Sequence, residues 1–336
     1  MSFSVKQYRL PVVGSIAMAA LLMWAVLMSA ALPLLAQTYP VRPVQITVPY
    51  PAGSNTDVVM RQLSPKMVES LGQQILVINQ VGAAGTIGTA AVAKATPDGY
   101  RILMGTSQQM GAAPFMFKEL AYDPIRDFAP IARIGGSILA LAVGSSMPIK
   151  SVAELVTYVK ANPAKSNYAS NGVGGTPHFA AVRFLDMGGL QVTHVPYNSP
   201  AMALTNLISG QMTFMFYPYP AMQGQVEGGL LRVIATTGAT RSSSLPQIPT
   251  MGESGFPGYT MQSWIGLYAP AGTARPIIDK LNAATVRALT DPELSKKLTD
   301  SGLTINTSTP EELGQFTRSE NETFRRMVSL SGIKPE

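Results

Sequence analysis

Four loops that follow predicted strands carry glycines, hydroxyls and amides, residue types that can hold a small anion without a charged side chain. They run over 50–57 (YPAGSNTD), 79–88 (NQVGAAGTIG), 105–109 (GTSQQ) and 169–178 (ASNGVGGTPH). Glycine lets the backbone approach a ligand closely, and Ser and Thr hydroxyls can complete the hydrogen bonds of a carboxylate. One such loop could be a simple turn, but four loops at equivalent places favour a ligand site.

The elements that must position these loops alternate between short β-type runs and helical stretches, a pattern that predicts parallel sheets with crossover helices. A helix is expected over 55–71, ending at Gly72. Strands are expected at 44–49, 75–79, 101–105, 138–143, 166–169, 192–196, 212–216 and 231–236. Ligands of open parallel sheets lie beyond the carboxyl ends of the strands, near helix N-termini, so the loops are expected to gather there.

Helix caps are clear in the second half of the chain. Ser151 and Glu154 have capping-box spacing ahead of an apolar helical run. Three helices are expected at 274–289, 292–301 and 310–330, the last two beginning with Asp291-Pro292 and Thr309-Pro310 as cap and first residue.

Within the loops we select candidate ligand-binding residues by their polar groups or exposed main chain. They are Tyr50, Ala52, Gly53, Ser54, Asn55, Asp57, Ala84, Gly85, Ser107, Gln108, Ser170, Asn171, Thr176, His178, Tyr197 and Tyr217. Asp57 could equally serve its own helix, because a carboxylate in the first turn is favoured by the macrodipole. His178 could donate to an anion, whereas His194, in an apolar strand, is expected to be a satisfied core residue.

The N-terminus predicts export. Lys6 and Arg9 precede an apolar run from Leu10 to Ala36 that contains no charge, as in a secretory signal cleaved after Ala36. An uncleaved membrane anchor remains an alternative, because the run is long enough to span a bilayer. Residues 1–36 are therefore expected to be a signal peptide and the mature protein to be periplasmic.

The composition excludes several classes of site and partner. The chain has 336 residues, of which 46% are hydrophobic and 13% charged, a globular composition. It has no cysteine, which excludes disulfides, thiolate metal sites and a lipid-modified cysteine. The net charge is +6, but Lys and Arg are scattered, so a nucleic-acid partner is disfavoured. With two histidines, we expect no metal and no cofactor.

An enzymatic function has little support. The sequence contains no Gly-x-Ser-x-Gly elbow, His-Glu-x-x-His helix, Walker loop or complete dinucleotide fingerprint. A remote alternative is a hydrolase that uses Ser170 and His178, but no carboxylate is spaced to orient the imidazole. A second alternative is a sensor that presents its bound state to a receptor kinase.

Short motifs in a fixed order carry a resemblance to a known family. They include Tyr39-Pro40-Val41-Arg42-Pro43, Pro97-Asp98-Gly99-Tyr100, Tyr122-Asp123-Pro124, Asn167-Tyr168-Ala169-Ser170, His194-Val195-Pro196-Tyr197, Glu253-Ser254-Gly255 and Ala269-Pro270-Ala271-Gly272. With the loops above, they span nearly the whole mature chain. The sequence resembles the extracytoplasmic binding proteins of tripartite tricarboxylate transporters, the Bug family.

The resemblance implies a type II periplasmic-binding-protein fold of the α/β class: two lobes, each with a central mixed sheet flanked by helices, joined by two hinge crossings. We place one lobe at 39–137 with 260–336 and the other at 138–259, with crossings near 133–137 and 258–262. The first two loops would grip one carboxylate largely through main-chain groups and waters. A monomer would pass a small di-, tri- or aromatic carboxylate to the membrane subunits of the transporter.

Some residues depart from the family pattern. Gln80, Val81 and Ala84 replace a basic residue, a proline and a glycine of the second loop, which suggests a stiffer or differently shaped loop. Tyr217 stands where an aspartate is common, which disfavours an amino-acid or hydroxylated ligand that needs this aspartate. An aromatic or apolar-bodied carboxylate would suit Tyr217, Pro218 and Tyr219, although core packing explains these rings equally well.

Overall fold

The computed structural model describes residues 39–197, 199–242 and 244–335. The chain divides into two units, 1–41 and 42–336, and every helix and strand described belongs to the second unit. The predicted signal peptide, residues 1–36, lies outside the described residues.

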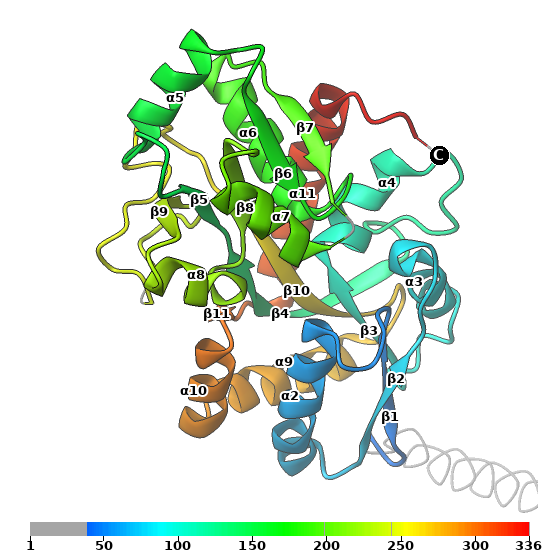
Figure 1. The fold of residues 1–336 in the computed structure, drawn as a ribbon. Coiled ribbons are helices and arrows are strands. Elements are labelled where there is room, and N and C mark those ends of the chain that lie inside the picture. Colours follow the sequence, from blue (N-terminus) through cyan, green and yellow to red (C-terminus); the bar gives the residue numbers. More distant parts are fainter. Residues whose placement is uncertain (1–38, 198, 243, 336) are drawn as a thin grey trace, which may run out of the picture. The chain divides into compact units, whose positions relative to one another are not determined.

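One sheet has six strands in the order β11-β4-β10-β3-β1-β2 (Figure 1). Its strands are β1 (Val44–Val48), β2 (Ile75–Asn79), β3 (Arg101–Thr106), β4 (Phe128–Ile138), β10 (Gln262–Pro270) and β11 (Thr304–Ile305). β1 pairs with β2 and β3 in parallel, whereas β10 runs antiparallel to β3 and β4. This sheet is therefore mixed, and the loops after β1, β2 and β3 leave it at the same edge.

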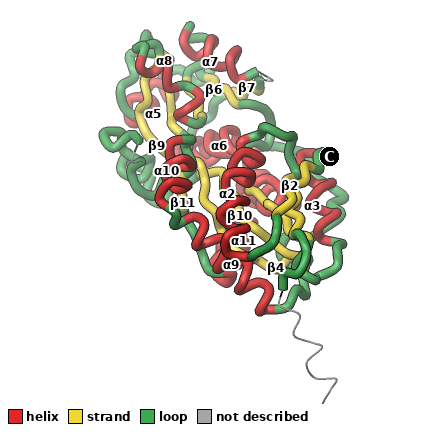
Figure 2. Tube along the Cα trace, turned by 90° about the horizontal axis from the view of Figure 1, so that it is seen from below, coloured by secondary structure: helices red, strands yellow, loops and turns green. Residues whose placement is uncertain are grey.

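Helices of this lobe begin and end largely where the sequence predicts. They are α2 (Asn55–Leu71), α3 (Thr86–Ala93), α4 (Ala113–Met116), α9 (Arg275–Leu289), α10 (Pro292–Asp300) and α11 (Pro310–Ser331), with short turns η2 (Ala83–Gly85) and η3 (Gln108–Ala112). α2 and α9 lie side by side (Figure 2). The predicted caps are confirmed: the Asp291 carboxylate accepts from the Leu294 N–H, and Thr309 forms a capping box with Glu312.

A second sheet has five strands in the order β7-β6-β8-β5-β9. The strands are β5 (Ala140–Gly144), β6 (Asn167–Ser170), β7 (Thr193–Pro196), β8 (Phe214–Tyr217) and β9 (Leu231–Thr236). The helices are α5 (Val152–Ala161), α6 (Thr176–Gly188), α7 (Pro200–Ile208) and α8 (Gln223–Glu227), with the turn η4 (Tyr219–Ala221). This sheet is also mixed, since β6 is parallel to β7 and β8 while β5 is antiparallel to β8 and β9.

The chain passes between the sheets twice, at Leu139 and again after Thr236. The first crossing lies two residues beyond the predicted segment 133–137, because β4 continues to Ile138 with Gly136 and Ser137 paired to β10. The two crossings are tied together at Thr237, which is fully buried. The Thr237 N–H donates to the Leu139 carbonyl at 2.9 Å, and the Leu139 N–H donates to the Thr237 hydroxyl at 2.8 Å. The same hydroxyl donates to the Met261 carbonyl. The hinge is thus a hydrogen-bonded pair of chain segments.

The C-terminal helix α11 belongs to both cores. Near its start Leu313 packs with Trp264 and Tyr268 of the first sheet, whereas Phe324 and Met327 are buried in the core of the second. Arg326 reaches Asp186 of α6 with a 2.7 Å ion pair. The sequence did not predict this sharing, so the lobe boundaries at 137/138 and 259/260 remain a prediction.

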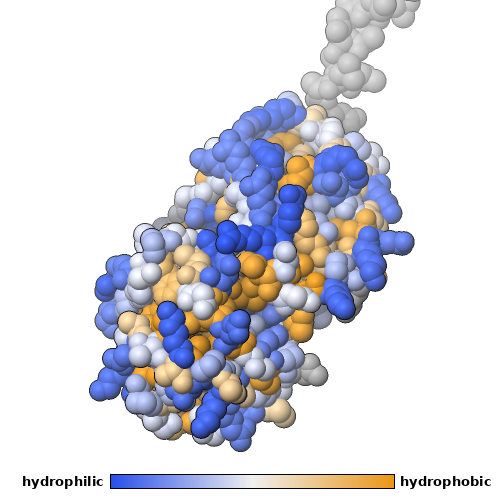
Figure 3. Space-filling view, turned by 90° about the horizontal axis from the view of Figure 1, so that it is seen from above, coloured by the Kyte–Doolittle hydropathy of each residue, from blue (hydrophilic) through white to orange (hydrophobic). Residues whose placement is uncertain are grey.

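Apolar side chains gather along the middle of the face shown in Figure 3, between polar ones. Exposed apolar residues of the chain include Val173 and Leu330, which are 55% and 48% exposed and line one surface hollow. Within the described part of the chain, no helix has the length and apolarity needed to cross a membrane.

Candidate functional site

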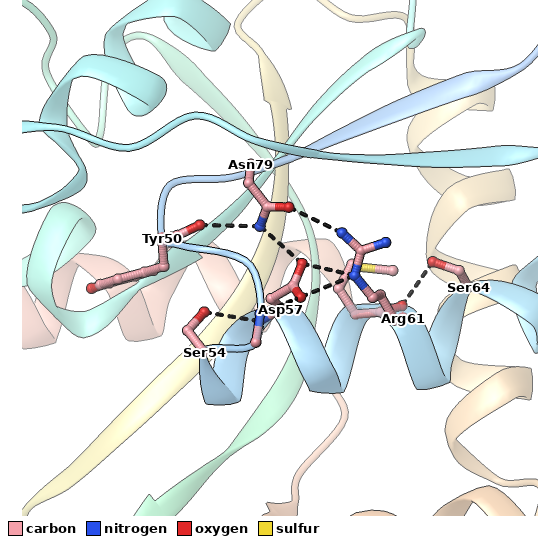
Figure 4. Close-up of polar contacts among 8 residues, drawn as sticks. Tyr50, Ser54, Asp57, Arg61, Ser64 and Asn79 are labelled. Carbon is pink, nitrogen blue, oxygen red and sulfur yellow. Dashed lines mark hydrogen bonds and ion pairs between the residues drawn. The ribbon is translucent and has the colours of Figure 1, made fainter.

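The first loop is organised around Asp57, at the N-terminus of α2 (Figure 4). Its carboxylate accepts from the Gly53 N–H at 2.9 Å, from Asn79 Nδ2 at 2.8 Å and from Arg61 Nε at 2.9 and 3.0 Å. Asn79 Nδ2 also donates to the Tyr50 carbonyl at 3.1 Å. Asp57 therefore ties the first loop to the start of the second.

Asp57 is a buried carboxylate that stays charged. Burial alone would raise its pKa, but the hydrogen bonds from Arg61, Gly53 and Asn79 bring the pKa down to about 2. Four hydrogen bonds already occupy its oxygens, so the side chain faces its own loop. Of the two interpretations of Asp57, the contacts fit the one in which it shapes the helix start.

The second loop has an unusual backbone. Ala83 and Ala84 have φ of 44° and 53°, the left-handed region that L-residues avoid, and Gly85 has φ of 89°. A Cβ on Gly85 would lie 2.4 Å from Gln109 Nε2 and 3.1 Å from the Pro49 carbonyl. Gly85 thus admits Gln109, and Ala84 adopts a conformation that a glycine would adopt without strain.

The third loop is joined to the other two through Gln109, which is fully buried. Gln109 Nε2 donates to the Ala84 carbonyl at 2.7 Å and to the Tyr50 hydroxyl at 2.9 Å. Thr106 donates to Gln109 Oε1 at 2.7 Å and lies 3.2 Å from the same tyrosine hydroxyl. The structure therefore brings three predicted loops together, and we call residues 50–57, 79–88 and 105–109 the lobe-1 rim.

The predicted residues of the lobe-1 rim differ in exposure. Ser107 and Gly85 are buried, Tyr50, Ser54 and Gln108 are half-buried, and Ala52, Gly53, Asn55 and Ala84 are exposed. Gln109, expected from the sequence to help set ligand specificity with Gln108, is instead fully buried and holds the loops to one another. Asn79, which was not selected as a ligand-binding residue, does the same. Asn79 is the last residue of β2 and Gln109 lies three residues after β3, so their place at the ends of strands was the available signal.

The fourth loop, residues 170–176 after β6, is the lobe-2 loop. Ser170 Oγ lies 2.9 Å from the Gly172 carbonyl, 3.2 Å from the Gly172 N–H and 2.7 Å from His194 Nε2. A hydroxyl can donate one hydrogen bond and accept two, so these three contacts use all the hydrogen-bonding capacity of Ser170. Ser170 therefore faces the interior of its own loop.

His178 is also turned inward. It is 3% exposed, its Nδ1 accepts from the Gly174 N–H at 3.0 Å, and its ring stacks on His194 at 4.1 Å between centroids. The Ser170–His178 pairing that the hydrolase alternative requires is wrong, because the imidazole bound to Ser170 is that of His194. His194 is half-buried at the edge strand β7, bonded through one nitrogen.

Other predicted residues of the lobe-2 loop remain accessible. Asn171 is exposed and Thr176 is half-buried at the start of α6, whose N-terminus has no side-chain cap. Gly174 marks the place where this loop approaches the first lobe, since a Cβ there would lie 2.1 Å from Met116 Cε. Met116 Sδ in turn lies 3.8 Å from Gln108 Nε2 of the lobe-1 rim.

The two predicted tyrosines lie in different surroundings. Tyr197 is half-buried, and its hydroxyl accepts from Asn206 Nδ2 at 2.8 Å. Tyr217 is 8% exposed and packs in the apolar cluster of the second lobe, where burial raises its pKa. Most of the Tyr217 ring therefore serves the core.

The Ser170–His194 pair lacks the rest of a nucleophilic site. An activated serine needs a base that a third group orients, and among the described residues no hydrogen bond to His194 Nδ1 occurs. The described residues also hold no cluster of three acidic or imidazole groups that could bind a metal ion. The geometry therefore favours a binding site formed by main-chain donors.

A family model described as "Tripartite tricarboxylate transporter family receptor" matches residues 59–333. A similar protein is BugT of Bordetella pertussis, 31% identical over 305 residues that cover 90% of this chain and 94% of BugT. This family consists of substrate-binding receptors.

Two solved structures of similar proteins contain carboxylates. Rpa4515 of R. palustris with adipate is 30% identical, with a TM-score of 0.73 over 89% of this chain and 100% of that one. MatC (Rpa3494) of Rhodopseudomonas palustris with bound malate is 32% identical, with a TM-score of 0.69 over 86% and 100%. The predicted type II periplasmic-binding-protein fold is confirmed, and the chain belongs to the tripartite tricarboxylate transporter receptor family, the TctC or Bug family.

Proposed function

We propose that this protein captures a small dicarboxylate between its two lobes in the periplasm and delivers it to the membrane subunits of a tripartite tricarboxylate transporter. Adipate and malate in the two relatives make a dicarboxylate the favoured class among the acids expected from the sequence. Residues 1–36 would direct export.

The observation that carries the proposal is the joining of three predicted loops into one rim at the N-terminus of α2. Helix N-termini present unpaired N–H groups and a partial positive charge, which together suit a carboxylate. Arg61 is held by Asp57 and Asn79, so the rim would bind the anion through main-chain donors. The exposed main-chain groups that would serve are those of Asn55 and Ala84, since the Gly53 N–H already donates to Asp57.

The lobe-2 loop would supply the second set of contacts when the lobes close. Its accessible groups are Asn171, the Thr176 hydroxyl and the uncapped N-terminus of α6. Gln108 and Tyr197 would contact the remainder of the ligand, with Tyr217 at the end of β8 contributing its hydroxyl edge. A ligand that bridges both lobes stabilises the closed form by its differential affinity for that form.

A thermal-shift titration tests the ligand class. Adipate and malate should raise the melting temperature in a concentration-dependent way, because a ligand at 100 times its Kd stabilises the folded state by about 2.7 kcal/mol. Adipamide is the matched control, since it keeps the length of adipate and removes both charges. No shift with any di-, tri- or aromatic carboxylate would overturn the proposal.

Two matched cap variants test whether the α2 N-terminus belongs to the site. Ser54 caps α2 and Ser151 caps α5 through the same contact, a side chain accepting from the N–H three residues on. Each change to alanine should destabilise the protein by about 1 kcal/mol. Only Ser54→Ala should weaken adipate binding in isothermal titration, and equal affinities for both variants would remove this helix from the site.

Delivery needs a separate measurement. Uptake of radiolabelled dicarboxylate by cells that contain the two membrane subunits should depend on this protein and should fall when residues 1–36 are deleted. If the protein bound the dicarboxylate but uptake did not depend on it, the binding function would stand and the transporter would be ruled out as its partner.

A further inference from the structure

Two imidazoles lie under the lobe-2 loop and have no place in direct ligand contact. His194 Nε2 is 2.7 Å from Ser170 Oγ, at the beginning of the loop, and His178 Nδ1 accepts from the Gly174 N–H at 3.0 Å, near its end. Gly172 and Gly174 have φ of 119° and 80°, so the loop backbone between these anchors is of a kind that glycine favours. The loop is therefore fixed at both ends by one histidine each.

The hydrogen bonds define the protonation of both rings. His178 Nδ1 is an acceptor, so a neutral His178 carries its proton on Nε2. The Ser170 hydroxyl donates to the Gly172 carbonyl and accepts from the Gly172 N–H, so His194 Nε2 is the second donor to it. Protonation of His178 at Nδ1 would put two donors face to face and would break the bond from Gly174.

The surroundings oppose a positive charge on either ring. The rings of His178 and His194 stack at 4.1 Å and 9°, and Tyr168 of β6 stacks on them at 6.2 and 4.8 Å. Phe179 of α6 stacks on His178 at 5.5 Å. Burial, with His194 nearby, lowers the pKa of His178 to about 4, and burial lowers the pKa of His194.

No free carboxylate near the pair compensates for such a charge in the described part of the chain. The two rings line a surface hollow of about 810 Å³ with Asp186 of α6 and with Leu330 and Ile333 from the end of α11. Asp186 is already paired with Arg326 of α11 at 2.7 Å. The hollow gives solvent protons a route to the imidazoles from the outer side of the lobe.

We propose that His178 and His194 are positioning residues that hold the lobe-2 loop in its ligand-binding shape, and that protonation of His178 releases the loop and weakens binding, whereas His194 Nε2 remains a donor to Ser170 in either protonation state. The inference rests on the proposed function and adds a pH-dependent control to it. The released loop would leave Asn171 and Thr176 without a fixed orientation toward the carboxylate.

Paired variants separate the hydrogen bonds from the ring packing. His178→Phe keeps a stacking ring and removes the acceptor, whereas His178→Asn places an amide oxygen near the position of Nδ1 and does not titrate. His194→Phe and His194→Gln do the same for the donor to Ser170. At pH 7.5, adipate affinity by isothermal titration should fall tenfold or more in both phenylalanine variants, and Asn and Gln should restore most of it.

The pH profile distinguishes positioning from a purely structural role. The affinity of the wild type relative to that of His178→Asn should fall about threefold between pH 7 and about pH 3.7, where a group with a pKa of about 4 is two-thirds protonated. Protonation of adipate itself cancels in this ratio. Circular dichroism at each pH confirms that both proteins remain folded. A constant ratio, or phenylalanine variants that bind as tightly as the wild type, would overturn the inference.

Amide exchange gives a readout that needs no ligand. If the wild type bound neither adipate nor malate, the proposed function would fail for these acids, and the loop would still be tested by exchange of the Gly174 N–H. Faster exchange in His178→Phe than in His178→Asn at pH 7 supports positioning. Equal exchange in both variants contradicts it.

Discussion

The lobe-1 rim and the lobe-2 loop are held in shape by opposite kinds of chemistry. In the rim, a charged group is central: the Asp57 carboxylate collects Gly53, Asn79 and Arg61. In the lobe-2 loop, neutral rings are central, since His178 and His194 stack on each other and bond Gly174 and Ser170. If these two regions form the proposed site, acid should loosen one half of it while the other half keeps its shape.

The largest effect should come from removing the charge at the centre of the rim. Asp57→Ala leaves the Gly53 N–H and the Asn79 and Arg61 side chains without their partner, and we expect a loss of about 3 kcal/mol in the free energy of unfolding. Urea denaturation measures it. Asp279→Ala, which removes an exposed Arg275–Asp279 pair four residues apart, should cost less than about 0.5 kcal/mol. A similar loss of unfolding free energy in both variants would show that the Asp57–Arg61 pair contributes no more than an exposed surface ion pair.

The two regions should differ in the pH at which their central groups, His178 and Asp57, stop contributing to the free energy of unfolding. The folded-state pKa of His178, about 4, is below its ordinary value of 6.5. The unfolded chain therefore binds the proton first, and stability falls by about 1.4 kcal/mol per pH unit from pH 6.5 toward 4, about 2 kcal/mol by pH 5. The pKa of Asp57 is about 2, so its contribution is complete above pH 4 and is lost only below it.

Unfolding free energies of the wild type and His178→Asn between pH 7.5 and 4.5 measure the first part of this prediction. The variant should lack most of the decline, because asparagine does not titrate. If the two curves were parallel, the acid sensitivity would reside in other groups.

Local signals explain how much of this site could be predicted from the sequence. The bounds of α2 follow from the Ser54 cap and the left-handed Gly72, and the loops were located because each follows a strand. Side-chain direction could not be predicted, since it depends on distant partners. Asp57 meets Asn79 across 22 residues, and Ser170 meets His194 across 24.

The long strand β4 shows a second limit. Gly135 and Gly136 interrupt a β-type pattern, and the segment was predicted to be a hinge crossing. In the structure a Cβ on Gly135 would lie 2.4 Å from the Thr304 carbonyl of β11. Glycine therefore admits a neighbouring strand that is 169 residues away in the sequence, a requirement that no local pattern reveals.

The next prediction tests the glycine of the lobe-2 loop. Gly174→Ala would place a side chain at φ of 80° and bring its Cβ within 2.1 Å of Met116 Cε. We expect a loss of about 1–2 kcal/mol from the backbone conformation, because the Met116 side chain can move away. Differential scanning calorimetry measures it, and Gly210→Ala, also at positive φ but with open space around it, isolates the backbone part. Equal losses are therefore expected, and a clearly larger loss in Gly174→Ala would show that the Met116 side chain cannot move away.

The smallest effect concerns the opposite change in the rim. Ala84 has φ of 53° and ψ of 29°, so Ala84→Gly should relieve about 1 kcal/mol of backbone strain. Glycine loses more conformational entropy on folding, by about 0.5–1 kcal/mol, so we expect a net change between zero and a gain of about 0.5 kcal/mol. Ala90→Gly, inside α3, should instead cost about 1 kcal/mol. Chemical denaturation measures the free energy of unfolding of both variants. If Ala84→Gly lowered it as much as Ala90→Gly, Ala84 would carry no backbone strain, and the shape of the second loop would depend on Gln109 alone.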